Sequence, residues 1–516
     1  MTPAGRRPAL HALPDDVLLL VISHVDVPDI LSLRAVRPAR TSRRFCAMSK
    51  LRWVWYDAIQ RHVVQKGLPI PAATTDLKAL TSEHLEARTV HASRFHANWN
   101  APRPVTRAAI EFCAESSRDP DADGPHAVSH VAFLPGHNGQ YLLTTVGKTL
   151  AAWEIPLGSS EAYCVAEWVS TRKIEGMVVN DDPKGEVTVA IVSAHPTAEG
   201  VVECRSLSFD KFRGRFYCRM ELRARREVVS PLHYLHDDYL VFGDPMHVCF
   251  LGAPTHVKPL GNAALSEMTD NRVLAVKVIN RYLLVIRQRA FEVLFAPTWK
   301  GMRASYPSLV SASVSIEMDI SASNATIVFR QSPYDASEDQ PDWPSEPVTV
   351  LSRYSDDGFD TLHQYDFLPN PMAKRTELEK GAPPTTMEYI PCIFPSRSTT
   401  IVSVAPSSCD FRVGPSGKGF WTETRNITLR HARTPARCLV GFTVRPATPR
   451  DRDPKACKAR RVARLELCKD ALYWRRCNIH EILWKKYMMV STAFEDTVGR
   501  IAIGDAMGRV EVLDLA

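Results

Sequence analysis

Apolar residues along the chain follow two different patterns, and the change comes near residue 105. From 13 to 60 they recur every three or four positions, as Val17, Leu18, Val21 and Ile22 do. This is the period of a helix that buries one side. A second helical pattern covers 76–99 and ends before Pro102. The first part of the chain is therefore predicted to be helical.

Beyond residue 105 the helical period is replaced by short apolar runs between turn-forming residues, as in a β-rich domain. Four such runs are alike, at 141–145, 239–243, 282–286 and 501–504. Each is followed by a second apolar strand, ending at 155, 251, 295 and 514 respectively. One blade of a β-propeller needs roughly 40 to 45 residues. The interval from 141 to 239 then predicts two blades with a short insertion. The interval from 239 to 282 predicts one blade, and the interval from 282 to 501 predicts five.

These patterns predict an α + β multidomain protein: a helical module, then a mostly antiparallel all-β domain forming a β-propeller of about seven blades. A stack of β-sandwich domains is the alternative. The predicted domains are 1–65, with its core at 11–60, a connecting helical linker at 66–104, and a propeller-like recruitment domain at 105–516. Insertions are expected near 331–347, 369–390 and 445–460. The β-domain is expected to fold alone.

Closure of the ring is also predicted, because an open propeller would expose unpaired strand edges. The alternating run at 510–515 has the pattern of a closing strand. We expect it to pair with a strand at 105–112 or at 128–133. Gly508, just before this run, suits a turn that requires a positive φ.

The segment 13–59 resembles an F-box, most closely the F-box of mushroom-forming fungi. It begins with Leu-Pro at 13–14, continues with Pro-Asp-Ile-Leu at 28–31 and Ser-Arg-Arg-Phe at 42–45, and ends with Trp-Val-Trp at 53–55. A generic helical bundle would share the apolar period but not this order of motifs. Residues 36–40 make the join between the second and third helices longer than usual, and Pro38 cannot lie inside a helix. Either these residues form a loop between the two helices, or they are present because an exon boundary was assigned wrongly.

The resemblance implies binding to a Skp-type adaptor, and through it to a cullin–RING ubiquitin ligase. A module this small cannot enclose all its apolar side chains, so the surplus would contact the adaptor. The residues expected to carry this contact are Leu13, Pro14, Leu18, Ile22, Leu31, Leu33, Phe45, Trp53 and Trp55. The β-domain would recruit an unknown protein substrate, which makes the chain a substrate-recognition subunit of an SCF-type ligase. The alternatives are a scaffold acting outside degradation, a propeller enzyme, or a nucleic-acid-binding module.

Composition adds little support for catalysis or nucleic-acid binding. The net charge of +7 is weakly basic, and the basic stretch 445–486 is diluted by acidic residues, so nucleic acid is not the expected partner. Nucleophile-elbow, phosphate-loop and His-Glu-x-x-His motifs are missing, as is any Cys-x-x-Cys pair. We therefore expect no catalytic residues, cofactor or metal. The early apolar run 17–22 is too short to span a bilayer, so no membrane contact is expected and the protein is placed in the cytoplasm, the nucleus or both.

Overall fold

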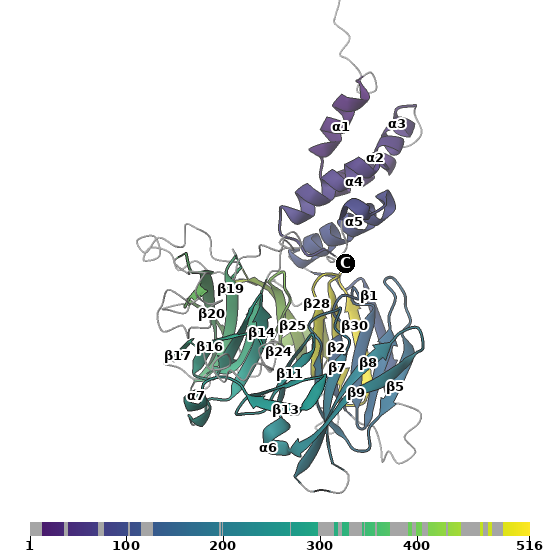
Figure 1. Ribbon diagram of the computed structural model, residues 1–516. Coiled ribbons are helices and arrows are strands. Elements are labelled where there is room, and N and C mark those ends of the chain that lie inside the picture. Colours follow the sequence, from purple (N-terminus) through teal and green to yellow (C-terminus); the bar gives the residue numbers. More distant parts are fainter. Residues whose placement is uncertain are drawn as a thin grey trace, which may run out of the picture.

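The computed structural model has a helical part at one end and a ring of β-sheets below it (Figure 1). It describes residues 13–35, 40–70, 77–101, 104–114, 127–195, 198, 200–268, 270–297, 314–317, 322–329, 343–344, 346–356, 359–371, 391–394, 399–404, 411–429, 432–444, 465–467, 473–476 and 489–516. Of the extra residues at 36–40, the first four lie outside this part of the chain, as do most of the three expected insertions, and Arg40 is the first residue of a helix.

The helical part consists of short helices followed by one longer helix. They are α1 (Asp15–Ser23), α2 (Val27–Ala35), α3 (Arg40–Met48), α4 (Arg52–Ile59) with a π-helical turn (Gln60–Val64), a 3₁₀ turn (Leu77–Ala79) and α5 (Ser82–Trp99). The hydroxyl of Thr81 caps α5 by accepting a hydrogen bond from the His84 N–H at 3.3 Å. The helical patterns at 13–60 and 76–99 are thus confirmed.

The β-domain is a propeller of seven antiparallel sheets, as predicted. We number the sheets as blades 1–7 in chain order. Blade 1 is β2 (Val128–Phe133), β3 (Tyr141–Val146), β4 (Thr149–Glu154) and β5 (Tyr163–Val169); blade 2 is β6 (Ile174–Val179), β7 (Val189–Ala194), β8 (Val201–Asp210) and β9 (Arg215–Arg225). Blade 3 is β10 (Leu232–His236), β11 (Tyr239–Phe242), β12 (His247–Phe250) and β13 (Ala253–Pro259); blade 4 is β14 (Val273–Ile279), β15 (Tyr282–Arg287), β16 (Ala290–Phe295) and β17 (Val314–Glu317). Two short helices, α6 (Arg226–Val229) and α7 (Ala263–Glu267), precede blades 3 and 4.

Blades 5 and 6 include long strands, whereas the strands of blade 7 are as short as those of blade 1. Blade 5 is β18 (Ala322–Val328), β19 (Val348–Asp356) and β20 (Phe359–Pro369), with β21 (Cys392–Ile393) and β22 (Thr399–Val404) both paired to β20. Blade 6 is β23 (Phe411–Val413), β24 (Lys418–Leu429) and β25 (Ala432–Val444), with β26 (Leu465–Leu467) and β27 (Tyr473–Arg476) both paired to β25. Blade 7 is β28 (Met489–Glu495), β29 (Arg500–Asp505), β30 (Arg509–Asp514) and β1 (Ala108–Cys113).

The ring closes by pairing the first strand of the β-domain with the last. β1 lies antiparallel to β30, with Ala108 opposite Asp514 and Cys113 opposite Arg509. The expected pairing of the C-terminal run with the strand near 105–112 is therefore confirmed, whereas the run at 128–133 is β2, the innermost strand of blade 1. Gly508 has the positive φ expected of it, 75°.

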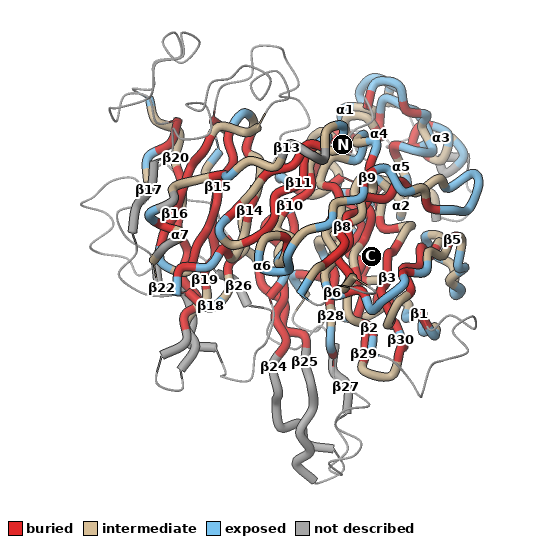
Figure 2. The backbone as a smooth tube through the Cα atoms, turned by 60° about the horizontal axis from the view of Figure 1, so that its bottom comes forward, coloured by how far each residue is buried: buried red, intermediate tan, exposed pale blue. Residues whose placement is uncertain are grey.

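The four similar runs in the sequence are the second strands of their blades, β3, β11, β15 and β29, and the runs that follow them are the third strands. These strands lie between two others and face neighbouring blades, which is why they are the most continuously buried (Figure 2). The predicted interval of five blades between 282 and 501 is wrong. It spans three blades, because blades 5 and 6 are much longer than a standard repeat.

Helix α5 belongs to both parts of the molecule. Its first half packs on the other helices through residues such as Leu85 and Val90. Its last turn carries Phe95 and Trp99 into a hydrophobic cluster of blades 6 and 7 that includes Phe420. Hydrogen bonds reinforce the contact: the His91 ring pairs with the Val498 carbonyl at 2.9 Å, and the Asn98 amide donates to the Leu515 carbonyl at 2.7 Å. The linker helix is therefore packed against the propeller rather than separate from it.

Candidate functional site

The helical module has a complete hydrophobic core of its own. Trp55 lies at its centre with no exposed surface and donates its indole N–H to the Ser49 carbonyl at 2.7 Å. The guanidinium of Arg34 lies over the Trp55 ring at 5.4 Å, and it also donates to the Glu86 carboxylate of α5 at 2.8 Å. These contacts tie α2, α4 and α5 into one unit, so the surface of the module is defined by a fixed arrangement of helices.

The structure divides the residues expected to contact an adaptor into three groups. Leu18, Ile22, Phe45 and Trp55 are buried within the module itself. Leu13, Leu31 and Leu33 are partly buried against that core. Pro14 and Trp53 are exposed, with half of the Trp53 side chain (52%) reaching solvent. Only the last two groups offer surface to a partner in this arrangement.

Helix α1 presents a second apolar side that the expected residues did not include. Val17, Leu20 and Val21 are all exposed, Leu20 to 59%, and their spacing places them on one face. The opposite face, with Leu18 and Ile22, is buried. A helix that is apolar on all sides is normally buried on all sides. The described part of the chain covers only one side of α1, so the other side has the character of an interface.

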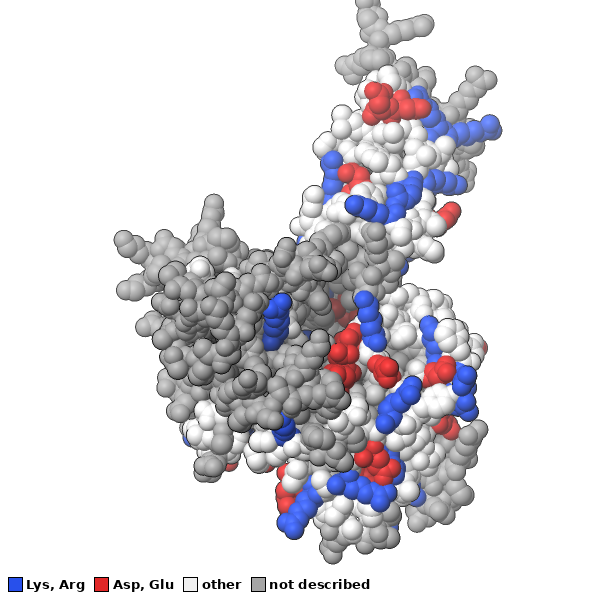
Figure 3. Space-filling view, in the orientation of Figure 1, with Lys and Arg blue, Asp and Glu red and all other residues white. Residues whose placement is uncertain are grey.

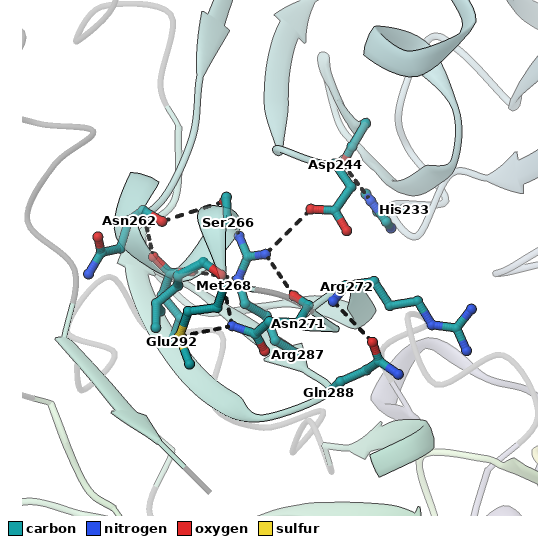
Figure 4. A network of polar contacts seen from close by, with 12 residues as sticks. His233, Asp244, Asn262, Ser266, Met268, Asn271, Arg272, Arg287, Gln288 and Glu292 are labelled. Atoms are coloured by element: carbon teal, nitrogen blue, oxygen red, sulfur yellow. Dashed lines mark hydrogen bonds and ion pairs between the residues drawn. The ribbon is translucent and has the colours of Figure 1, made fainter. Parts of the chain in front are cut away.

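A buried polar network joins blades 3 and 4 on the face of the ring that carries α6 and α7 (Figure 4). Arg287 and Glu292 have no exposed surface, and the Arg287 Nε lies 3.4 Å from the Glu292 carboxylate. The Arg287 guanidinium also lies 3.6 Å from Asp244 and donates to Ser266 Oγ at 3.1 Å. Glu292 accepts from the Asn262 N–H at 2.6 Å. Because Arg287 and Glu292 are paired with these groups away from solvent, the network stabilises the junction of the two blades.

The paired acidic residues and histidines of the loops also have structural partners. Burial would raise the pKa of Asp181, but the Lys277 ammonium at 2.6 Å and hydrogen bonds from Lys277 and Tyr234 lower it below its usual value. His195 accepts from the Ala198 N–H and lies 3.5 Å from the buried Glu203. These contacts support the interpretation that such residues serve the fold.

Positive and negative side chains are interspersed on the face of the molecule shown in Figure 3. On the described part of that face the charges do not form a single-sign track of the kind that follows a nucleic-acid backbone. Most of the basic stretch at 445–486 lies outside the residues that the structure describes.

Comparison with known proteins assigns no family: no family model and no curated protein matches the chain. Among the residues with described positions, no group of His, Cys, Asp and Glu side chains could hold a metal ion. Within that same part of the chain, no helix has the length and apolar character needed to cross a membrane. The β-propeller fold is commonly a non-enzymatic scaffold, but one fold can carry many functions.

Proposed function

We propose that this protein is a non-catalytic F-box protein, in which the helical module binds a Skp-type adaptor and the propeller recruits a target protein to a cullin–RING ubiquitin ligase. The observation that carries the proposal is the exposed apolar face of α1, made by Val17, Leu20 and Val21 beside a complete core. Together with the order of motifs from Leu13 to Trp55, it supports an interface of the F-box kind. The motifs are most similar to those of fungal F-boxes.

In this proposal the protein contributes proximity and no chemistry of its own. The conjugating enzyme on the RING subunit transfers ubiquitin, and the recruited target presents a lysine at high effective concentration. The packing of α5 on both parts supports this role, because it fixes the direction in which a bound target faces relative to the adaptor. Among the cysteines whose side chains the structure describes, such as the buried Cys204 and Cys392, none is in a disulfide, which fits a reducing compartment such as the cytoplasm or nucleus.

Co-purification with a Skp-type adaptor tests the interface. The double substitution Leu20→Ser, Val21→Ser removes exposed apolar surface without touching the core, so adaptor binding should fall by about tenfold or more while the melting temperature stays unchanged. Replacing Leu13 and Pro14 together by alanine should act in the same direction. The matched control is Val105→Ser, which changes an equally exposed apolar residue next to the propeller (60% exposed). Undiminished adaptor binding by the α1 double variant would refute the proposed interface.

The role in degradation needs a separate measurement, because a scaffold would also bind the adaptor. Proteins captured with the full-length chain should accumulate when the proteasome is inhibited and when the α1 double variant replaces the wild type. If captured proteins bind the chain but their lifetimes do not respond to either change, the protein is an adaptor-bound scaffold acting outside degradation.

A further inference from the structure

The turn between β8 and β9 holds the most exposed large apolar side chain in the described part of the chain, Phe212, which is 90% exposed. The turn is fixed from both sides. The Asp210 carboxylate accepts hydrogen bonds from the N–H groups of Phe212 and Arg213 at 3.0 and 3.1 Å. Gly214 follows with φ of +59° and lies against β5 so closely that a Cβ there would be 2.7 Å from the Val165 carbonyl oxygen. Phe212 is therefore presented on a rigid tip rather than on a loose loop.

Basic side chains lie beside this aromatic ring and at the start of the strand that follows it. The Lys211 ammonium lies 5.1 Å from the Phe212 ring centre. Arg213 and Arg215 both donate to the hydroxyl of Tyr217, Arg213 at 3.2 Å, and the Arg215 guanidinium lies over the Tyr217 ring at 4.7 Å. Two guanidinium groups are thus held next to one another on the same hydroxyl oxygen.

Within residues 210–217 the cations Lys211, Arg213 and Arg215 outnumber the single carboxylate, Asp210. Asp210 is 3.7 Å from Arg213 and is engaged in the turn. The next carboxylate along the strand, Glu221, is paired with Arg205 and Arg223. Adjacent guanidinium groups repel one another, and an oxyanion that accepts from both would remove that repulsion. The tip therefore offers two adjacent guanidinium donors for a carboxylate, beside the exposed Phe212 ring for an apolar side chain.

The tip lies on the same face of the propeller as the helical module. In a four-stranded antiparallel blade, the connection between the first two strands and that between the last two emerge at the same face. The β28–β29 turn touches α5 through Val498, and the β8–β9 turn emerges on that side of blade 2. An occupant of the tip would thus sit on the face that carries the proposed adaptor-binding module.

We propose that this tip, residues 210–217, docks an acidic, extended protein segment that carries an apolar side chain next to its carboxylates. The inference rests on the proposed function and names the chemistry of the recruited target. Charge complementarity with Lys211, Arg213 and Arg215 selects the acidic groups, and Phe212 takes the apolar side chain. A flat bilayer approaching this face would meet the helical module (Figure 1), and the few cations do not form a track for a nucleic-acid backbone.

Fluorescence polarisation with the full-length protein tests the proposal. The probe is a short fluorescein-labelled peptide of alternating glutamate and phenylalanine, and a glutamine-for-glutamate peptide measures the charge requirement. We expect saturable binding of the acidic peptide that Phe212→Ser, and separately Arg213→Gln with Arg215→Gln, weaken by about tenfold. Arg225→Gln is the matched control, because Arg225 is an exposed arginine at the other end of the same strand.

The proposal is overturned if the acidic peptide does not bind, if the glutamine peptide binds as well, or if Arg225→Gln weakens binding as much as the tip variants do. It is also overturned if only an oligothymidine strand or vesicles containing phosphatidylserine respond to the tip variants. Adaptor co-purification should be unchanged by Phe212→Ser. Loss of peptide binding with intact adaptor binding, or the reverse, therefore separates the two proposals.

Discussion

The indole of Trp99 stacks on the ring of Phe494, with ring centroids 5.6 Å apart and planes 22° from parallel. Trp99 is the last residue of α5, and Phe494 lies on the innermost strand of blade 7. Trp99 also donates its indole N–H to Thr443 Oγ1 at 3.1 Å, which connects the same helix end to blade 6. The end of the linker helix is thus a component of the propeller core.

Trp99→Ala should accordingly destabilise the propeller and not only the helical module. Removing a fully buried tryptophan costs about 3–5 kcal/mol of unfolding free energy. The measurement is denaturant unfolding of the full chain. The control is Trp53→Ala, which removes the same side chain from an exposed position and should change stability by about 0.5 kcal/mol or less. Equal effects of the two substitutions would contradict the shared core.

Fragment stability gives a second test of the same packing. The break at Pro102 and Pro104 predicts a β-domain that folds from residue 105, but such a fragment lacks Phe95 and Trp99. We expect a fragment starting at residue 77 to be soluble and to melt close to the full-length protein, and a fragment starting at 105 to melt lower and aggregate. Limited proteolysis should yield a product that retains α5. A stable product beginning near 105 would restore the simpler boundary.

The sequence was informative where side chains are buried on two sides. The second and third strands of blades face both neighbours, so they appear as continuous apolar runs, such as Leu240-Val241-Phe242 in β11. Innermost and outermost strands are only half-covered and mix polar with apolar residues. In blades 5 and 6 long connections separate these runs, so the repeat period of a blade is not visible in the sequence. The sequence therefore predicts too many blades between 282 and 501.

The exposed sites were harder to predict, because residue type alone does not set exposure. Leu18 and Leu20 are both leucines of α1, yet the first is fully buried and the second is mostly exposed. Phe212 and Phe216 differ in the same way at one hairpin. Neighbouring helices and blades decide which side is covered, and that information is not local. The order of F-box motifs could therefore suggest an interface but not which side chains remain available for it.

Stability should depend on pH through Glu495, at the end of β28. Burial, and then the nearby Asp496, raise the pKa of the Glu495 carboxyl to about 7. Between the ordinary glutamate pKa and about 7 the folded state therefore binds more protons than the unfolded state. Protonated Glu495 stabilises the folded state at low pH, and this stabilisation is lost as the pH rises through that window. The Glu495→Gln variant should have the same unfolding free energy as the wild type near the ordinary glutamate pKa. Above about pH 7 the variant should be more stable than the wild type.

Thermal melts of both proteins across this range provide the measurement. The difference between the two melting temperatures separates the effect of Glu495 from that of the histidines, which both proteins share. Burial lowers the pKa of histidines such as His91 and His233, so their effect on the pH dependence of stability has the opposite sign. A constant difference between the two melting temperatures at all pH values would show that the carboxyl keeps an ordinary pKa in the folded protein.

Ring closure depends on β30, which lies between β29 and β1. Val512 pairs with Ala502 on one side and with Ile110 on the other. A chain that ends at Gly508 would lose both pairings and expose the edges of the two remaining strands. We expect it to lose most of a typical margin of roughly 5–15 kcal/mol and to be poorly soluble. Arg509→Gln is the control, because it removes only the exposed ion pair with Glu111 and should cost about 1 kcal/mol or less. If the truncated chain melted at the temperature of the control, the β1–β30 pairing would not be what holds the ring closed.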